Sequence, residues 1–155
     1  MLAVRKIISG GQTGVDRAAL DFALENNIEI GGFIPKDRAA EDGRIPDKYP
    51  NLIETATTDP AERTELNIKI SDATLILSQG PLSGASKLTK ELAERYGKPV
   101  LHIDLSSLPL AQAVTKTKDW LNSIDHGILN IAGPRASEDG EIYAKTKHFL
   151  KSLCQ

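Results

Sequence analysis

The chain is poor in features that mark several classes of protein. Its one cysteine, Cys154, cannot form an intrachain disulfide, and such sparse use of cysteine is typical of a reducing cytoplasm. No run approaches the roughly 20 apolar residues that a membrane-spanning helix needs. The formal net charge is only -2, which gives no general attraction to nucleic acid or anionic lipid. We therefore expect a cytoplasmic protein that binds neither membrane nor nucleic acid.

Patterns for metal binding and nucleophilic catalysis are also missing. His102, His126 and His148 are scattered, without the spacing of metal ligands, and there is no cluster of cysteine and histidine. We expect no zinc site and interpret His102, which lies within a strand pattern, as structural. The segment Met1–Lys6 lacks the long apolar stretch of a signal peptide, so we expect none.

What the sequence does contain is an alternation of strand and helix patterns. Its 155 residues, 40% of them hydrophobic, suit one domain with a sizeable core. Such alternation favours an α/β fold with a mainly parallel sheet and helices on both faces. The predicted strands are residues 4–9, 28–34, 51–57, 73–77, 100–105 and 128–132, and the predicted helices are residues 15–25, 60–71, 86–96, 111–123 and 141–153.

Three loops with glycine, at residues 9–14, 80–86 and 132–137, each follow a predicted strand. If these strands are parallel, all three loops leave the same edge of the sheet, where open α/β sheets bind their ligands. Glycine lets the backbone approach a ligand closely, and a helix N-terminus presents free N–H groups to an anion. The sequence therefore predicts a site for a phosphate-bearing small molecule.

The first loop, Ser9–Gly14, is the most informative of the three. Thr13 is a predicted N-cap, with Asp16 three residues later to complete a capping box. Arg17 in the first helical turn could reach a ligand anion or pair with Asp16. The loop has neither the dinucleotide-binding nor the Walker spacing, and its glycines, Gly10, Gly11 and Gly14, could serve only a sharp turn.

The other two loops supply hydroxyl groups and an arginine. Gly80 and Gly84 flank a turn before Ser86 and Thr89, and Ser86 could contact a ligand or simply cap its helix. In the third loop, Arg135 beside Gly133 could clamp a phosphate or lie on the surface.

Two further groups of polar residues carry open alternatives. The segment Lys36–Tyr49 predicts a long loop, which is either functional or a mobile surface insertion. Its carboxylates, Glu41 and Asp42, could bind a hydrated metal or act as acid and base, although such pairs are more often solvent-exposed. Arg63 and Asn67 are four residues apart and share one face of a helix, which is usually a solvated face.

Several segments together resemble the family of putative molybdenum carriers, relatives of the molybdenum cofactor carrier proteins. This family lies within a Rossmann-like superfamily that includes the Lonely Guy phosphoribohydrolases, also described as lysine-decarboxylase-like. The resemblance covers nearly the whole chain. The segments that show the resemblance are residues 9–20, 35–36, 40–43, 45–46, 63–65, 67, 71–76, 97–99 and 129–135.

The resemblance implies a single-domain Rossmann-like three-layer fold that holds the molybdenum cofactor (molybdopterin) or a nucleotide, and it implies a homo-oligomer. It also raises Arg63 and Asn67 to site candidates. The ligand-binding residues that we predict are Gly10, Gly11, Gln12, Thr13, Gly14, Arg17, Lys36, Arg63, Asn67, Gly80, Gly84, Ser86, Thr89, Gly133 and Arg135.

One departure from the wider superfamily bears on catalysis. The phosphoribohydrolases carry a Pro-Gly-Gly-x-Gly-Thr loop followed by a catalytic glutamate, and Thr89 stands where that glutamate would be. A hydroxyl cannot supply the carboxylate that supports an oxocarbenium ion, which favours a binding protein. A nucleotide-processing hydrolase or transferase, with Glu41, Asp42 or Asp16 as its carboxylate, is one alternative. A nucleotide-sensing module is another.

Overall fold

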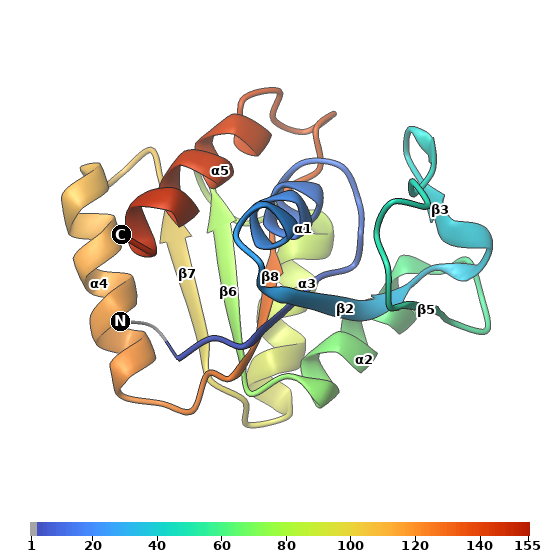
Figure 1. Cartoon of the computed structure of the whole chain (residues 1–155), viewed down its shortest axis with the longest axis horizontal. Coiled ribbons are helices and arrows are strands. Elements are labelled where there is room, and N and C mark those ends of the chain that lie inside the picture. Colours follow the sequence, from blue (N-terminus) through green and yellow to red (C-terminus); the bar gives the residue numbers. More distant parts are fainter. Residues whose placement is uncertain (1–2) are drawn as a thin grey trace.

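A six-stranded parallel sheet forms the centre of the computed structural model, which describes residues 3–155 (Figure 1). Met1 and Leu2, part of the segment for which we expect no signal peptide, lie outside the described residues. The strand order is β5-β2-β1-β8-β6-β7. The strands are β1 Lys6–Ile8, β2 Glu29–Ile34, β5 Leu52–Glu54, β6 Ala73–Ser78, β7 Val100–Asp104 and β8 Ile128–Ala132.

The central strands are apolar because helices cover both of their faces. Every residue of β6 is buried, and β8 is buried from Leu129 onward. The last strand lies between β1 and β6, so that Ile7 pairs with Leu129, and Leu75 pairs with Ile131. The sheet confirms the predicted parallel α/β architecture.

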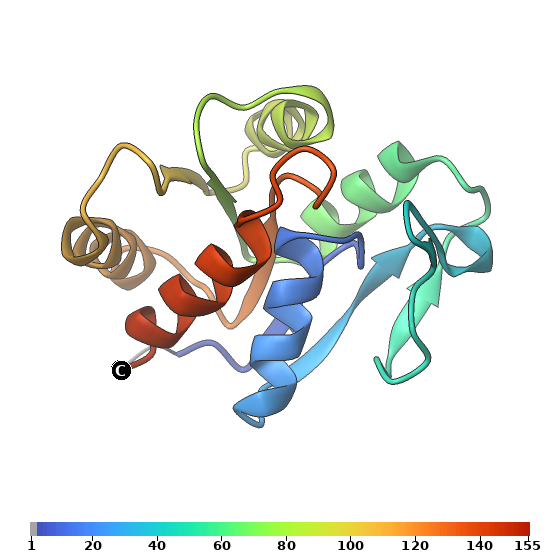
Figure 2. The ribbon, with the colours of Figure 1, turned by 90° about the horizontal axis from the view of Figure 1, so that it is seen from above.

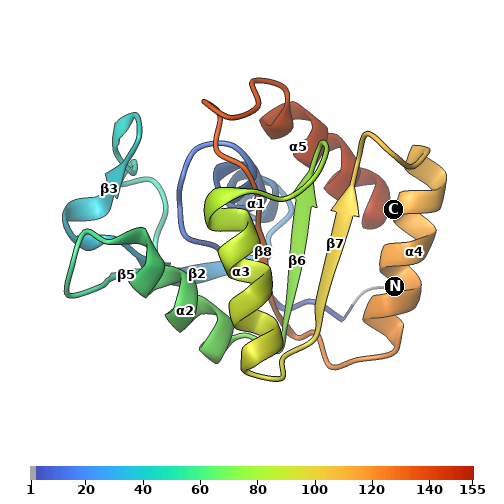
Figure 3. The ribbon, with the colours of Figure 1, turned by 180° about the vertical axis from the view of Figure 1, so that it is seen from behind.

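Five helices form the two outer layers. The helices α1 Val15–Glu25, α4 Leu110–Asn122 and α5 Ile142–Leu153 lie on one face, where α1 and α5 run side by side (Figure 2). The helices α2 Pro60–Ile70 and α3 Gly84–Arg95 cover the other face (Figure 3). Within the described part of the chain, no helix is both long and apolar enough to cross a membrane.

The helix starts test the predicted caps. Asp59 caps α2 by accepting a hydrogen bond from the Ala61 N–H at 3.0 Å, with Pro60 in the first turn as predicted. The predicted Thr13 cap of α1 is wrong, because Gly14 holds that position at φ 80° without a side-chain hydrogen bond. A Cβ atom at Gly14 would lie 2.3 Å from the Pro134 carbonyl oxygen. Because the third loop passes so close to Gly14, only glycine fits at this position, and α1 begins directly after it.

The segment Lys36–Tyr49, called the strap from here on, is more ordered than a long loop. It begins with the 3-10 turn η1 Lys36–Arg38 and continues as a short hairpin of β3 Ala39–Ala40 and β4 Gly43–Arg44, which the sequence did not predict. Ile45 is fully buried in the main core, and the buried Tyr49 donates a hydrogen bond to Asp21 at 2.6 Å. The strap is therefore fastened to the domain at its C-terminal end.

The side chain of Asn67 ties α2 to β2. Its amide oxygen accepts from the Phe33 N–H at 2.7 Å, and its amide nitrogen donates to the Phe33 carbonyl at 3.0 Å. Asn67 is only 1% exposed. Both polar groups of the Asn67 side chain thus bind the backbone of β2. This structural role accounts for an asparagine at position 67 without any contact to a ligand.

We expect Asn67→Ala to lower the free energy of unfolding by about 1–3 kcal/mol, because it leaves the two Phe33 groups without their partner. Urea unfolding of the two proteins measures the difference. Asn122→Ala, at an exposed position in α4, is the control and should change stability by less than about 0.5 kcal/mol. Equal effects of the two substitutions would contradict a clamp at Asn67.

Candidate functional site

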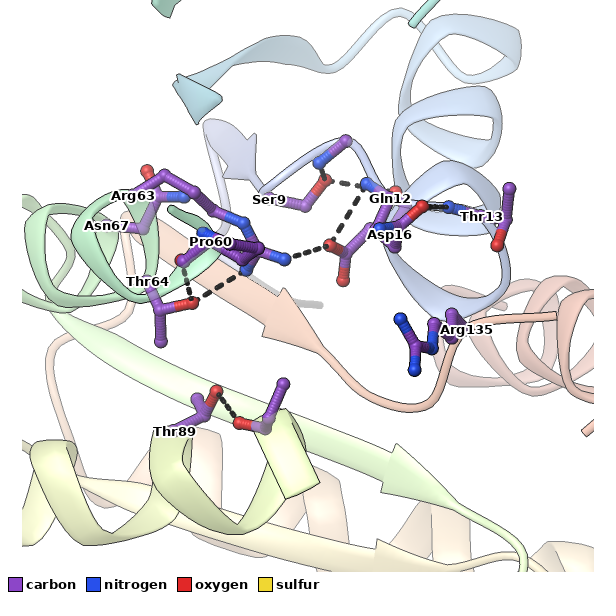
Figure 4. A network of polar contacts seen from close by, with 12 residues as sticks. Ser9, Gln12, Thr13, Asp16, Pro60, Arg63, Thr64, Asn67, Thr89 and Arg135 are labelled. Carbon is purple, nitrogen blue, oxygen red and sulfur yellow. Dashed lines mark hydrogen bonds and ion pairs between the residues drawn. The ribbon is translucent and has the colours of Figure 1, made fainter. Parts of the chain in front are cut away.

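A cleft of about 150 Å³ opens at the carboxyl edge of the sheet, where the first turns of α2 and α3 face the first and third loops. Figure 4 shows Arg63 and Asp16 pointing toward one another, with Thr89 on α3 across from them. This is the edge at which the sequence predicts the ligand. The lining residues are Gln12, Asp16, Pro60, Arg63, Gly84, Ala85, Ser86, Thr89, Ala132, Gly133, Arg135 and Glu138.

Arg63, from the first turn of α2, places a nearly buried cation in this cleft. Its side chain lies flat against the backbone of Gly10, where an added Cβ atom would stand 2.5 Å from the guanidinium. Nη1 donates to the Thr64 hydroxyl at 2.8 Å, whereas Nε is buried and has no hydrogen-bond partner among residues 3–155. Because buried donors are rarely left unpaired, the protein itself satisfies this guanidinium only in part.

Asp16, from the first turn of α1, places a buried carboxyl beside that cation. Its Oδ2 lies 3.8 Å from Nη2 of Arg63 and accepts a hydrogen bond from the Gln12 N–H at 3.2 Å. Burial raises the pKa of Asp16 to about 6, although Arg63, the Gln12 N–H and Arg17 all act to lower it. The carboxyl thus titrates close to neutral pH, and the cleft is most cationic when Asp16 carries its proton.

The first turn of α3 forms the opposite wall of the cleft. Gly84, Ala85 and Ser86 line it, and the Ser83 side chain makes no capping hydrogen bond to them. The N–H groups at the start of a helix have no partner within the helix, and the helix dipole adds partial positive charge there. A phosphate in the cleft would meet Arg63 on one side and these N–H groups on the other.

Four backbone N–H groups between Gly11 and Val15 have partners within the protein. Those of Gly11 and Gln12 bind the Ser9 hydroxyl at 3.4 Å and the Asp16 carboxyl at 3.2 Å, respectively. Those of Thr13 and Val15 bind the Gln12 side chain at 3.0 Å and the Pro134 carbonyl at 3.2 Å. The first loop therefore contributes to the cleft mainly through its backbone, against which Arg63 packs at Gly10. The Asp16 carboxyl comes from the helix that follows it.

Arg17 fastens the strap and does not face the cleft. Nε donates to the Gly11 carbonyl at 2.8 Å, and the two terminal nitrogens bind both oxygens of Asp42 at 2.8 and 2.9 Å. We predicted contact with a ligand anion or a pair with Asp16, but its ion-pair partner is Asp42. A bidentate pair of this kind is strong and directional, so it fixes the strap against the first loop.

The structure gathers part of the predicted set at the cleft and places the rest around it. The predicted residues that line the cleft are Gln12, Arg63, Gly84, Ser86, Thr89, Gly133 and Arg135. The predicted residues outside its lining are Gly10, Gly11, Thr13, Gly14, Arg17, Lys36, Asn67 and Gly80. The sequence analysis did not assign Pro60, Ala85, Ala132 and Glu138 to the site, and it interpreted Asp16 most simply as a cap.

Two features could have pointed to some of the missed residues. Pro60 marks the first turn of a helix that begins after a strand, so it had to lie near the edge where the loops meet. Glu138 follows Arg135 by three residues and pairs with it at 3.3 Å. Burial of Asp16, by contrast, depends on Arg63 and the third loop, which no local pattern near Asp16 reveals.

His102, in the middle of β7, contacts Ser78, the last residue of β6, with Nε2 2.6 Å from the hydroxyl oxygen. The Ser78 hydroxyl donates to the Gly80 carbonyl at 2.8 Å, so Nε2 must be the donor in its contact with Ser78. Burial also lowers the pKa of His102. A neutral imidazole that donates to the serine cannot deprotonate it, so this pair serves the turn after β6.

The side chains offer no cage for a bare metal ion. Between residues 3 and 155, no three histidine, cysteine, aspartate or glutamate residues lie close enough together to hold one. Pockets that enclose a drug-sized ligand measure roughly 300–1,000 Å³. A cleft of about 150 Å³ is smaller than that and has room for a group of the size of a phosphate.

Comparisons with known proteins identify the family and the fold. The model of the circularly permutated YpsA SLOG family matches residues 7–154. The 1.45 Å crystal structure of a protein from Syntrophus aciditrophicus SB, named putative molybdenum carrier protein, shares 51% sequence identity. It superposes with a TM-score of 0.97 over 99% of this chain and 97% of that chain. No curated protein matches the chain significantly. The fold and the family resemblance predicted from the sequence are thereby confirmed.

The raised pKa of Asp16 predicts a pH dependence of stability. Between pH 3.8 and about 6 the carboxyl is protonated in the folded protein and ionised in the unfolded chain, so unfolding releases a proton. The stabilising contribution is fully present below pH 3.8 and is lost as the pH rises through about 6. Relative to Asp16→Asn, the free energy of unfolding should fall by about 3 kcal/mol over this range.

Urea unfolding of the two proteins at pH 4, 5, 6 and 7 measures this difference. A difference that stays constant with pH would show that Asp16 titrates like an exposed carboxyl. A difference that grows with rising pH would show that the pair with Arg63 outweighs burial.

Proposed function

Because the chain belongs to the circularly permutated YpsA SLOG family, we propose that it binds a phosphate-bearing small molecule, either molybdopterin or a nucleotide. The phosphate lies between Arg63 and the first turn of α3. The observation that carries this proposal is the incompletely paired guanidinium of Arg63, which lines the cleft opposite the uncapped start of α3.

The electrostatics of the cleft support an anionic ligand. Arg63 and Arg135 line the cleft together with Asp16 and Glu138, so the four charges balance when both carboxyls are ionised. Protonation of Asp16 removes one negative charge near its pKa of about 6. A phosphate that enters beside Asp16 favours this protonated form, because like charges in a buried site repel one another.

The name of the Syntrophus aciditrophicus relative, at 51% identity, favours molybdopterin among phosphate-bearing ligands. The size of the cleft agrees with recognition through the phosphate, so a carrier role requires no enclosed pocket for the pterin ring.

We expect the double variant Asp16→Asn/Arg63→Gln to bind nucleoside monophosphates and molybdopterin about 10–100-fold more weakly than the wild type. This range corresponds to the loss of a hydrogen bond from a charged donor, worth about 1.5–3 kcal/mol. The pair is changed together so that no unpartnered charge is left buried. Isothermal titration calorimetry with each ligand measures the change.

Arg44→Gln is the matched control for the loss of one arginine. Arg44 lies on the exposed hairpin of the strap, pairs with Asp47 at 2.6 Å and does not line the cleft. Binding by the control should equal that of the wild type. Wild-type affinity in the double variant would place the phosphate elsewhere.

Native mass spectrometry of gently purified protein, with molybdenum analysis of the same sample, identifies the ligand. A bound mass that matches a phosphorylated pterin supports the carrier function, and one that matches a nucleotide supports the nucleotide alternative. The same spectrum gives the oligomeric state, for which the resemblance predicts self-association.

A nucleotide hydrolase is the second candidate function, and Asp16 is the observation that favours it. Among the three carboxylates considered from the sequence, Asp42 is paired with Arg17 and Glu41 is held by the third loop, whereas Asp16 lines the cleft. Its pKa of about 6 suits a general acid or base near neutral pH.

If the protein is such a hydrolase, it releases free base from nucleoside monophosphates, and Asp16→Asn reduces this rate at least 100-fold while binding persists. Chromatographic detection of the base measures the rate. An equal rate in wild type and variant would exclude Asp16 as the acid or base, and no release by the wild type would leave the binding function alone.

A further inference from the structure

The side chain of Glu41, in the strap, sits among donors from the first and third loops. It accepts hydrogen bonds from the Thr13 hydroxyl, the Ser137 hydroxyl at 2.5 Å and the Ser137 N–H at 3.1 Å. Nε of Arg135 lies 3.7 Å from the same carboxylate. Four donor groups thus converge on one carboxylate. The place that these donors of Thr13, Ser137 and Arg135 surround is called the Glu41 seat.

The donors of the Glu41 seat are arranged for an anion even apart from Glu41. The Ala136 N–H donates to the Thr13 oxygen at 3.0 Å, which leaves the Thr13 proton to point at the seat. The hydrogen bonds from Ser137 and Thr13 hold the pKa of Glu41 below its ordinary value, so its side chain is a carboxylate. Two hydroxyls, a backbone N–H and a guanidinium are donors that proteins also use for phosphate.

The Glu41 seat adjoins the cleft. Arg135 lines the cleft and also faces Glu41. Gln12 lines the cleft as well, and its side-chain oxygen accepts from the Glu41 N–H at 2.9 Å. An anion in the cleft and an anion in the seat would therefore be neighbours that share Arg135.

We propose that the Glu41 seat is a second phosphate site, that Glu41 fills it as an internal substitute, and that a ligand with two phosphate groups displaces the carboxylate. The proposal rests on the proposed function, because the first phosphate of that ligand occupies the cleft. The chemical class it names is a diphosphate, such as a nucleoside diphosphate, whose second phosphate reaches Thr13, Ser137 and Arg135.

The strap can release the Glu41 side chain without losing its own anchors. Asp42 stays paired with Arg17, Ile45 stays in the core, and Tyr49 stays bound to Asp21. The Glu41 side chain is 20% exposed, so it has a path into solvent. A phosphate near neutral pH carries more charge and more acceptor oxygens than a carboxylate, which favours the exchange.

The test compares the wild type with Glu41→Ala by isothermal titration calorimetry, with inorganic phosphate and pyrophosphate as probes. We expect one phosphate per chain for the wild type and two for Glu41→Ala, together with at least tenfold tighter binding of pyrophosphate. Adding Ser137→Ala to Glu41→Ala should reverse both gains. Asp47→Ala removes an exposed carboxylate from the same strap and should behave as the wild type.

The outcomes separate this inference from the proposed function. Unchanged phosphate and pyrophosphate binding in Glu41→Ala would overturn the second site. The phosphate site in the cleft would still be tested separately by the Asp16→Asn/Arg63→Gln variant. A gain in Glu41→Ala that Ser137→Ala removes supports the second site even if the Asp16→Asn/Arg63→Gln variant shows no loss. If thermal unfolding shows that Glu41→Ala is not folded, Glu41→Gln replaces it, since it keeps the length of the side chain without its charge.

Discussion

The site depends on the burial of one guanidinium. Arg63 leaves the first turn of α2, crosses the edge of the sheet and rests on the backbone of Gly10. A charge in that place is costly unless it is compensated, yet Asp16 lies 3.8 Å away with a pKa that burial has raised to about 6. The compensation is therefore partial, and an external anion can complete it. Arg63 can occupy this position only because residue 10 is a glycine, since a Cβ atom there would overlap the guanidinium.

The arginines around the first loop divide into two groups. Arg17 and Arg38 are satisfied by the protein, Arg17 by Asp42 and Arg38 by the carbonyl of Ile45 at 2.9 Å. They shape the strap and hold it over the loop. Arg63 keeps a free donor, and Arg135 is half exposed at the boundary between the cleft and the Glu41 seat. The sequence presents these residues as equivalent cations, and only their partners show which ones are available for a ligand.

Periodicity and turn chemistry predicted most of the fold. The strand at residues 128–132 and the helix at residues 15–25 were predicted with their observed limits, because apolar runs and helical spacing are local signals. The caps of α1 and α3 and the hairpin in the strap were missed. Gly14 became the cap of α1 because the carbonyl of Pro134 passes so near to it, a contact across the whole chain. Likewise, the sequence analysis predicted ligand-binding N–H groups in the first loop, whereas the nearby side chains of Gln12 and Asp16 accept from two of them. The start of α3 has no side-chain cap.

The topology makes the site depend on the C-terminal part of the chain. The final strand, β8, inserts between β1 and β6, so the sheet has no continuous centre until the C-terminal part of the chain has folded. The third loop follows β8, and it supplies Arg135 and Ser137 as well as the carbonyl that fixes the start of α1. Contacts between residues so distant in sequence form slowly, because loop closure must precede them. An incomplete chain can therefore contain Arg63 and Gly10 and still lack both the third wall of the cleft and the Glu41 seat. The proposed anion site is then a property of the completed sheet and cannot be assigned to the glycine loop alone.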